Sequence, residues 1–270
     1  MIENKSEIWS RAIRRRIIEM AHNVGKMGLH IGSALSTADI LAVLYADILK
    51  YDINNPLSPN RDYFVLSKGH AYMAFYAVLA EAGFISDNEI DENFMKDGGF
   101  LPAHSVMCLD KGIEFSSGSL GMGMPFAVGK AFALKTQHKS NQVFTLVGDG
   151  ECDEGSVLEA FGSAANLQLD NLTVIVDKNG FQQDGKTDDV LSIDIESVIR
   201  SYKWNVVCVN GHNHNELKEA FSKKFNNNLP KCIIAETIKG KGVSFMENNN
   251  FWHHANMNQK QYQQALEELK

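Results

Sequence analysis

Two side chains that can donate oxygen ligands follow neighbouring apolar segments and could bind a divalent cation. Asp149 follows the apolar run 143–147 and Asn179 follows the run 172–176, so 30 residues separate them. That spacing fits one strand–helix–strand unit, whose two strands end at the same edge of a parallel sheet. Magnesium usually takes a carboxylate or two together with phosphate oxygens of a ligand. The pair therefore predicts a metal–diphosphate site.

Glycines on both sides of Asp149 are compatible with this prediction. Gly148 and Gly150 lack side chains and would let the backbone approach a phosphate closely. The alternative is that both segments are ordinary turns after strands, which are often rich in Asp, Asn and Gly. Spacing alone leaves both interpretations open.

Other nucleotide and hydrolase motifs are absent from the sequence. A G-x-G-x-x-G motif fails at Gly121-Met122-Gly123, because Phe126 stands where the third glycine belongs. A Walker A loop from Gly123 to Gly129-Lys130 is one residue too long, and Ala131 replaces its hydroxyl residue. Neither H-E-x-x-H nor G-x-S-x-G occurs. Dinucleotide, P-loop, zinc-protease and esterase sites lose their main support.

The segments that position these residues alternate between strand and helix patterns, which predicts an α/β fold with a mostly parallel sheet and helices on both faces. The runs around Asp149 and Asn179 enclose a helical pattern, and such a unit forms a right-handed crossover. A second helix is expected to be capped by Ser36 or Thr37, and residues 84–104 are expected to be irregular. The predicted strands are 63–66, 143–147, 172–176, 204–209 and 232–235, and the predicted helices are 7–24, 37–45, 71–82, 125–134, 156–167, 215–225 and 259–269.

One family shares the pattern of these motifs along the chain. Gly148-Asp149-Gly150, Glu154-Gly155, Glu159 and Asn179 resemble the thiamine diphosphate (ThDP) signature. Further blocks in the family's order lie at 28–32, 38–41, 66–71, 102–104, 118–123 and 239–248. The sequence is most similar to transketolases, and specifically to the separate N-terminal subunit of split transketolases. The resemblance implies that residues 1–270 form a single diphosphate-binding (PP) domain.

The resemblance implies ThDP and Mg²⁺ as cofactors, with Ca²⁺ or Mn²⁺ as substitutes for the metal. Asp149, Asn179 and the carbonyl of Phe181 align with the family's metal ligands. Glu154 aligns with an acidic residue that links the two cofactor sites of the family's dimer. The other positions implied to contact the cofactor are Gly118 and Leu120, beside its two rings, and Gly148 and Gly150, beside its diphosphate.

Four histidines lie in family motifs: His30, His70, His104 and His253. Imidazole can move protons near neutral pH, which sugar chemistry on this cofactor requires. By resemblance, His70 and His104 hold the donor sugar or the cofactor, whereas His30 and His253 serve proton transfer. Four further histidines outside the motifs are expected to be structural or exposed: His22, His138, His212 and His214.

Three positions depart from the family pattern. The family usually has Trp-His-Gly where this chain has Trp252-His253-His254, which leaves open which histidine faces the site. Met122 replaces a common glutamine, and Leu29 replaces a common glycine. These departures suggest a divergent member that acts on a shifted substrate.

The resemblance also implies a partner chain. In the family, the glutamate that activates the cofactor lies in a pyrimidine-binding half, and this chain is expected to lack that half. We therefore expect a C-terminal subunit, an α2β2 heterotetramer, and transfer of a two-carbon ketol unit between sugar, sugar-phosphate or modified-sugar substrates. Two alternatives stay open: the alpha subunit of a ThDP-dependent 2-oxo acid dehydrogenase, and a non-catalytic pseudo-enzyme partner.

Composition agrees with an ordinary globular chain: 44% of its 270 residues are hydrophobic and 22% are charged, which excludes disordered and low-complexity architectures. A net charge of −7 disfavours binding to nucleic acid or to anionic membranes. The four cysteines have no C-x-x-C spacing, and no apolar run is expected to approach 18 residues. The first five residues lack the apolar core of a signal peptide, so a cytoplasmic location is expected.

Overall fold

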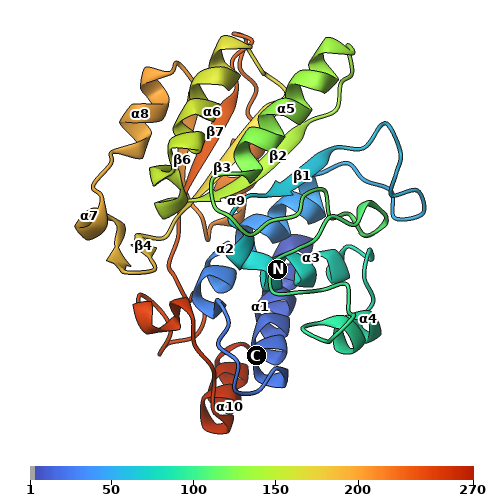
Figure 1. The fold of residues 1–270 in the computed structure, drawn as a ribbon, viewed down its shortest axis with the longest axis vertical. Helices are drawn as coiled ribbons and strands as arrows, with labels where there is room; N and C mark the ends of the chain where they lie inside the picture. The colour runs from blue at the N-terminus through green and yellow to red at the C-terminus, as the bar shows by residue number, and fades with distance from the viewer. Residues whose placement is uncertain (1–3) are drawn as a thin grey trace.

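Five parallel strands form the central sheet in a computed structural model that describes residues 4–270 (Figure 1). Residues 1–3, part of the segment expected to lack a signal peptide, lie outside the described residues. In spatial order the strands are β1 (Tyr63–Leu66), β2 (Val143–Gly148), β3 (Leu172–Lys178), β7 (Lys231–Glu236) and β6 (Asn205–Asn210). All five predicted strands and the mostly parallel sheet are confirmed.

The strand register aligns the segments that carry polar motifs. Gly148, the last residue of β2, pairs with Asp177 in β3, and Asp177 pairs in turn with Ala235 in β7. The carboxyl ends of these three strands therefore meet at one edge of the sheet, where ligands of such folds bind. Asp149 and Asn179 both follow strands that end there.

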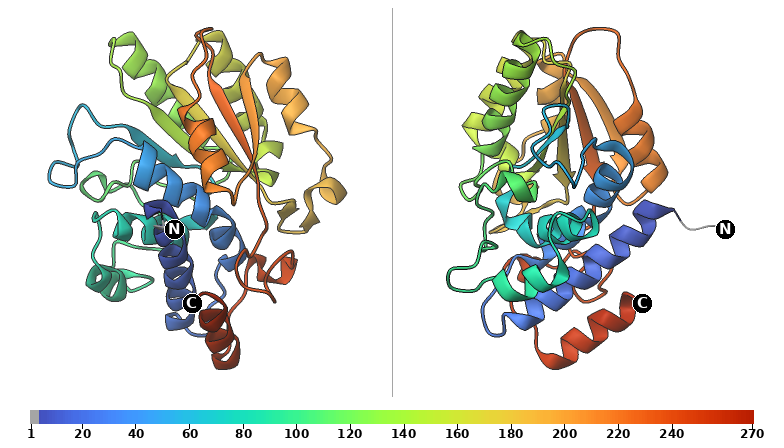
Figure 2. Two further views of the ribbon diagram at one scale, coloured as in Figure 1. Left: turned by 180° about the vertical axis from the view of Figure 1, so that it is seen from behind. Right: turned by 90° about the vertical axis from the view of Figure 1, so that its right-hand side faces the viewer.

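Helices cover both faces of the sheet, as predicted (Figure 2). Strands β2 and β3 are therefore buried on both sides. Phe144 and Leu146 belong to one core, whereas Val143 and Val147 point into the other. The first core includes residues of α1 (Lys5–Asn23), α2 (Ile31–Val43), α3 (Tyr72–Glu81), α9 (His214–Ser222) and α10 (Gln259–Glu268). The second includes residues of α5 (Gly123–Thr136), α6 (Gly155–Asn166) and α8 (Ile195–Ser201).

The prediction that the second helix starts at residue 37 with a Ser36 or Thr37 cap is wrong. Helix α2 starts at Ile31 and has His30 at its N-cap position. The Ser36 and Thr37 hydroxyls lie inside the helix and donate to the carbonyls of Ser33 and Ala34. Every residue of α2 is buried, so its sequence lacks the one-sided apolar pattern that marks a surface helix.

The prediction that residues 84–104 are irregular is wrong in part, because they contain helix α4 (Asp87–Asn93). A capping box starts it: the Glu89 amide donates to Ser86 Oγ, and Ser86 N–H donates to the Glu89 carboxylate. The S-x-x-E spacing in the sequence is the signal for this box. The sequence also failed to predict β4 (Phe181–Gln182), β5 (Gly185–Lys186), α7 (Thr187–Val190) and α8.

The expectation that no apolar run approaches 18 residues is wrong for the described residues. The helical segment Ile31–Ile48 has 18 residues and a mean hydropathy of 1.4, which is long and apolar enough to cross a membrane. In the fold 83% of this window is buried. The segment is apolar because α2 packs on α1 and α3 in the middle of the first core.

Candidate active site

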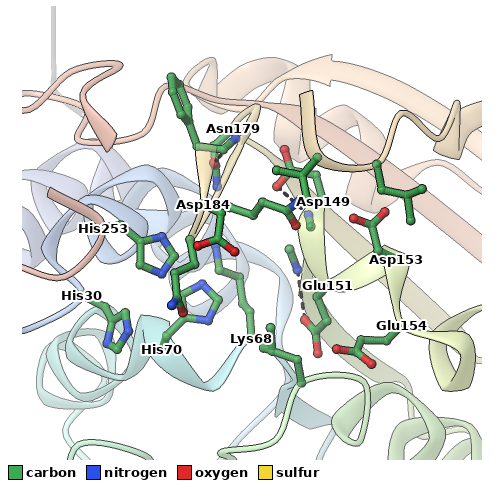
Figure 3. A pocket seen from close by; sticks show the side chains of 18 of the residues that line it. His30, Lys68, His70, Asp149, Glu151, Asp153, Glu154, Asn179, Asp184 and His253 are labelled. Carbon is green, nitrogen blue, oxygen red and sulfur yellow. Dashed lines mark hydrogen bonds between the residues drawn. The ribbon is translucent and has the colours of Figure 1, made fainter. Parts of the chain in front are cut away.

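A cavity of about 540 Å³ opens at the carboxyl edge of the sheet, between the loops that follow β1, β2 and β3 (Figure 3). All twelve residues singled out in the sequence line it: His30, His70, His104, Gly118, Leu120, Gly148, Asp149, Gly150, Glu154, Asn179, Phe181 and His253. Figure 3 shows three of the histidines on one side and Glu151, Asp153 and Glu154 on the other. The structure thus brings the residues together, and their individual roles stay predictions.

The predicted metal ligands are held by short backbone contacts. Asp149 accepts hydrogen bonds from the Gly150 and Gly180 amides, at 3.0 and 2.6 Å. Asn179 Oδ1 accepts from the Phe181 amide at 3.1 Å. Burial, and next the nearby carboxylate of Asp177, raise the pKa of Asp149 to about 6. A cation beside this crowded carboxylate would favour its charged form.

This donor set fits a hard cation. Across residues 4–270, no group of three or more His, Cys, Asp or Glu side chains is placed to hold a metal. One carboxylate, one amide oxygen and one backbone carbonyl leave several positions of an octahedron for water and phosphate oxygens, which is how Mg²⁺ is usually bound. A Cβ at Gly150 would lie 2.8 Å from Gln182 Cβ, so the backbone of residue 150 packs closely against Gln182 at the cavity.

The sequence missed Glu151, a buried carboxylate beside the predicted ligands. Glu151 accepts hydrogen bonds from Ser67 Oγ at 2.6 Å and from the backbone amides of Gly121 and Gly148. It thereby fixes the loop around Leu120 against the end of β2. The residue lies directly after the Gly-Asp-Gly motif, and that position is the signal that could have identified it.

A fully buried ion pair at the cavity was also missed. The side chains of Lys68 and Asp177 are both 0% exposed, and Lys68 Nζ donates to Asp177 Oδ2. Lys68 follows β1 within the block 66–71, and Asp177 lies two residues before Asn179. Both residues therefore adjoin positions that the sequence singled out.

The four motif histidines form a cluster around His30. Ring centroids lie 5.4 Å apart for His30 and His253, 5.6 Å for His30 and His70, and 6.1 Å for His30 and His104. Burial lowers the pKa of every member, to about 3 for His30 and about 4 for His253. At neutral pH the cluster therefore presents neutral imidazoles, which can each donate and accept a proton.

His253 faces the main cavity, whereas His254 lies beside it. His253 lines the 540 Å³ cavity. His254 is exposed and lines an adjoining cavity of about 340 Å³, with its ring 4.9 Å from that of His30. An antiparallel bridge between Leu29 and Ala255 holds the two segments together. The His-His pair thus adds a fifth imidazole next to the four in the motifs.

Lys239 determines which nitrogen of His253 carries the proton. The Lys239 side chain is buried, and its Nζ lies 2.9 Å from both His253 Nδ1 and Asn250 Oδ1. An ammonium group can only donate, so Nδ1 must accept and the proton of neutral His253 lies on Nε2. Burial, and next Lys68, lower the pKa of Lys239 to about 8. Below that pH, His253 is a fixed donor through Nε2.

We expect ¹⁵N NMR of labelled histidine to show the Nε2–H tautomer for His253 at pH 7. Lys239→Met removes the donor to Nδ1 and should let the Nδ1–H tautomer appear. Lys241→Met is the matched control, because Lys241 lies two residues away and pairs with Glu247 instead. Observation of the Nδ1–H tautomer in the native chain would contradict the assignment.

The histidine cluster also predicts loss of stability in acid. An unfolded histidine titrates near pH 6.5, whereas His30 and His253 in the fold titrate near 3 and 4. Between these values the unfolded chain binds more protons, so the free energy of unfolding falls as pH drops below about 6.5.

The decrease in the free energy of unfolding between pH 7.5 and pH 5 should be smaller for His30→Gln than for the native chain. The variant has one fewer imidazole to protonate on unfolding. Urea titrations at pH 7.5, 6 and 5 measure it, with His138→Gln at an exposed position as the control. An equal pH dependence in the native chain and in His30→Gln would contradict the expectation.

Two histidines expected to be structural or exposed belong to a buried ionic network. Asp39 accepts from Arg14, and it lies 2.7 Å from His212 Nδ1 and 3.0 Å from His214 Nε2. The Ile238 amide donates to His212 Nε2 at 2.8 Å. The structural interpretation is therefore correct for both, and the network holds the segment that carries Lys239.

The chain matches the family model "Transketolase, thiamine diphosphate binding domain" over residues 10–269. The class of protein is therefore a ThDP-binding domain, and the fold and the cavity agree with it. The 6-deoxy-6-sulfo-D-fructose transketolase subunit SqwG of Clostridium sp. (strain MSTE9) is 37% identical over 263 residues, 96% of this chain and 94% of the relative. An apulose-4-phosphate transketolase subunit of Phocaeicola vulgatus is 36% identical over 265 residues, 97% and 93% of the two chains.

The solved transketolase of Leishmania mexicana superposes with a TM-score of 0.89 and 26% identity, covering 98% of this chain. This chain spans only 41% of that longer protein. The chain belongs to the transketolase family.

Proposed function

We propose that this chain is the diphosphate-binding subunit of a two-chain transketolase-like enzyme that transfers a two-carbon ketol unit between sugar substrates. The observation that carries the proposal is the convergence of all twelve motif residues on one cavity at the carboxyl edge of the sheet. Two relatives of nearly the same length are named as transketolase subunits, which supports the two-chain organisation.

The chain's own residues would hold the cofactors. Asp149, Asn179 and the Phe181 carbonyl, which all line the cavity, would hold Mg²⁺, with Ca²⁺ or Mn²⁺ as possible substitutes, and Gly150 would contact the diphosphate. When bound, ThDP supplies the electron sink for the carbanion that ketol transfer needs. Gly118 and Leu120 would contact the two rings, and Glu154, which is exposed at the cavity edge, would face the partner.

The histidines provide the proton chemistry at the substrate. His253 would donate a hydrogen bond to the substrate through Nε2–H, because Lys239 donates to its other nitrogen, Nδ1. His30, neutral and surrounded by the other imidazoles, would accept the proton of the substrate hydroxyl that becomes a carbonyl when the C–C bond breaks, and would return a proton when the bond forms. His70 and His104 donate hydrogen bonds to the sugar hydroxyls or to the cofactor. General acid–base groups of this kind contribute about 10²–10⁴-fold to rate.

A C-terminal subunit with the pyrimidine domain would complete the site in an α2β2 heterotetramer. This chain would then be a single PP domain over residues 1–270. The solved transketolase of L. mexicana is more than twice as long as this chain, which supports a partner that would correspond to its remaining part. We further propose a cytoplasmic location and a sugar, sugar-phosphate or modified-sugar substrate. The two relatives are named for a sulfonated and a phosphorylated sugar.

The test is to mix the chain with ThDP, Mg²⁺ and a partner protein. That partner is the product of a neighbouring reading frame that encodes the pyrimidine domain. Ketol transfer to an aldose acceptor is expected, with no activity for either chain alone. Decarboxylation of 2-oxo acids with transfer to lipoyl groups would instead support the dehydrogenase alternative, which the family match disfavours. Calorimetry that shows no ThDP binding to the complex would support a pseudo-enzyme.

A further inference from the structure

Asp177 connects four separate segments of the chain at the floor of the cavity. Its carboxylate is fully buried and receives four donors. Ser36 Oγ from α2 and Asn179 Nδ2 lie 2.7 and 2.9 Å from Oδ2, which also accepts from Lys68 Nζ. Thr237, directly after β7, donates its hydroxyl to Oδ1. Such a density of donors on one carboxylate holds it in a single orientation.

The contact with Asn179 fixes the orientation of its amide group from both ends. Nδ2 donates to Asp177, while Oδ1 accepts from the Phe181 amide at 3.1 Å. A flipped amide would place its oxygen against the carboxylate and its NH2 group against the Phe181 N–H. Both contacts would be repulsive, so one orientation is strongly favoured.

Lys68 keeps Asp177 in the form that can only accept hydrogen bonds. The Lys68 ammonium can only donate, and it pairs with an Asp177 carboxylate whose side chain is 0% exposed. A carboxylate has no proton to donate. It therefore presents an acceptor to Asn179 Nδ2, and Oδ1, which accepts from the Phe181 amide, keeps a second lone pair that could bind a cation.

We propose that Asp177 and Lys68 are positioning residues that turn the amide oxygen of Asn179 toward the bound cation. The inference rests on the proposed function, in which Asn179 Oδ1 is a metal ligand. Residues behind metal ligands commonly change metal affinity about 10–100-fold when they are replaced.

Two double variants of the full chain separate the hydrogen bond from the charge. Lys68→Met with Asp177→Leu removes the ion pair and every side-chain acceptor at residue 177. Lys68→Met with Asp177→Asn removes the same charges but retains one amide oxygen. That oxygen can still face Asn179 Nδ2, because the Thr237 hydroxyl beside Oδ1 can accept from the new NH2 group. Neither double variant leaves a lone buried charge.

The first measurement is the affinity of each chain for Mn²⁺ with inorganic pyrophosphate, by electron paramagnetic resonance. We expect the Asp177→Asn double variant to stay within about threefold of the native chain and the Asp177→Leu double variant to bind at least about tenfold more weakly. Equal affinities for the two double variants, with both folded by circular dichroism, would overturn the proposal.

The second measurement needs no metal. Proton exchange of the Asn179 side-chain amide, assigned by its absence in Asn179→Ala, should be slow in the native chain and in the Asp177→Asn double variant, and at least about tenfold faster in the Asp177→Leu double variant. Equal exchange in all three would overturn the positioning role. If exchange behaves as expected but the native chain binds no Mn²⁺, the proposed cation site is wrong while the orientation of Asn179 stands.

Discussion

Replacing Asp149 by alanine is expected to lower ketol-transfer activity of the assembled enzyme by more than tenfold. The variant removes the one carboxylate among the three predicted metal ligands and leaves its two backbone donors, Gly150 N–H and Gly180 N–H, without an acceptor. Cation binding should weaken, and diphosphate binding should weaken with it, because the cation would link the diphosphate to the protein. The measurement is the rate of ketol transfer as a function of Mg²⁺ and ThDP concentration.

Asp170→Ala is the control for this variant. Asp170 is also a carboxylate, but it lies before β3 at the opposite end of the sheet and pairs with Lys135. Its replacement should leave activity within about twofold, because an exposed ion pair contributes little. If Asp149→Ala lowers ketol-transfer activity by less than tenfold at saturating ThDP, the assignment of Asp149 as a metal ligand is wrong.

Lys68→Met is expected to destabilise the fold by about 3–5 kcal/mol, because it leaves the Asp177 carboxylate buried without a countercharge. Urea titration of the metal-free chain at pH 7 measures this cost. The double variant Lys68→Met with Asp177→Leu should regain most of the lost stability, since two apolar side chains of similar size replace the pair.

The matched control is Lys135→Met, which breaks the exposed pair between Lys135 and Asp170. We expect it to cost no more than about 1 kcal/mol. If Lys68→Met costs as little as Lys135→Met, then Asp177 is solvated or protonated in the fold, and its interpretation as a charged acceptor fails.

The central fold could be predicted because its strands are buried on both faces. Apart from one threonine each, the runs 143–147 and 172–176 are apolar, and this composition identifies interior strands of a parallel sheet. The start of α2 could not be predicted in the same way. A helix that is buried all round has no periodic pattern, and serine and threonine inside it resemble caps.

The motif residues of the site could be predicted, but the residues behind them could not. Asp149 and Asn179 follow strands, and topology alone brings them to one edge. The burial of Lys68, Asp177 and Glu151 depends on tertiary packing from segments far apart in the chain, as in the bond from Ser36 to Asp177. In a sequence, such charged residues resemble ordinary exposed ones.

The position of β7 between β3 and β6 has a consequence for folding order. In sequence, β6 comes before β7, yet within residues 4–270 β6 pairs only with β7, and β3 pairs with β2 and β7. Until residues 231–236 are in place, β3 has an unpaired edge and β6 has no sheet to join. An open parallel edge is a template for association with other chains. Completion of this sheet therefore depends on a late-synthesised strand, so slow insertion of β7 would expose the nascent protein to aggregation during synthesis.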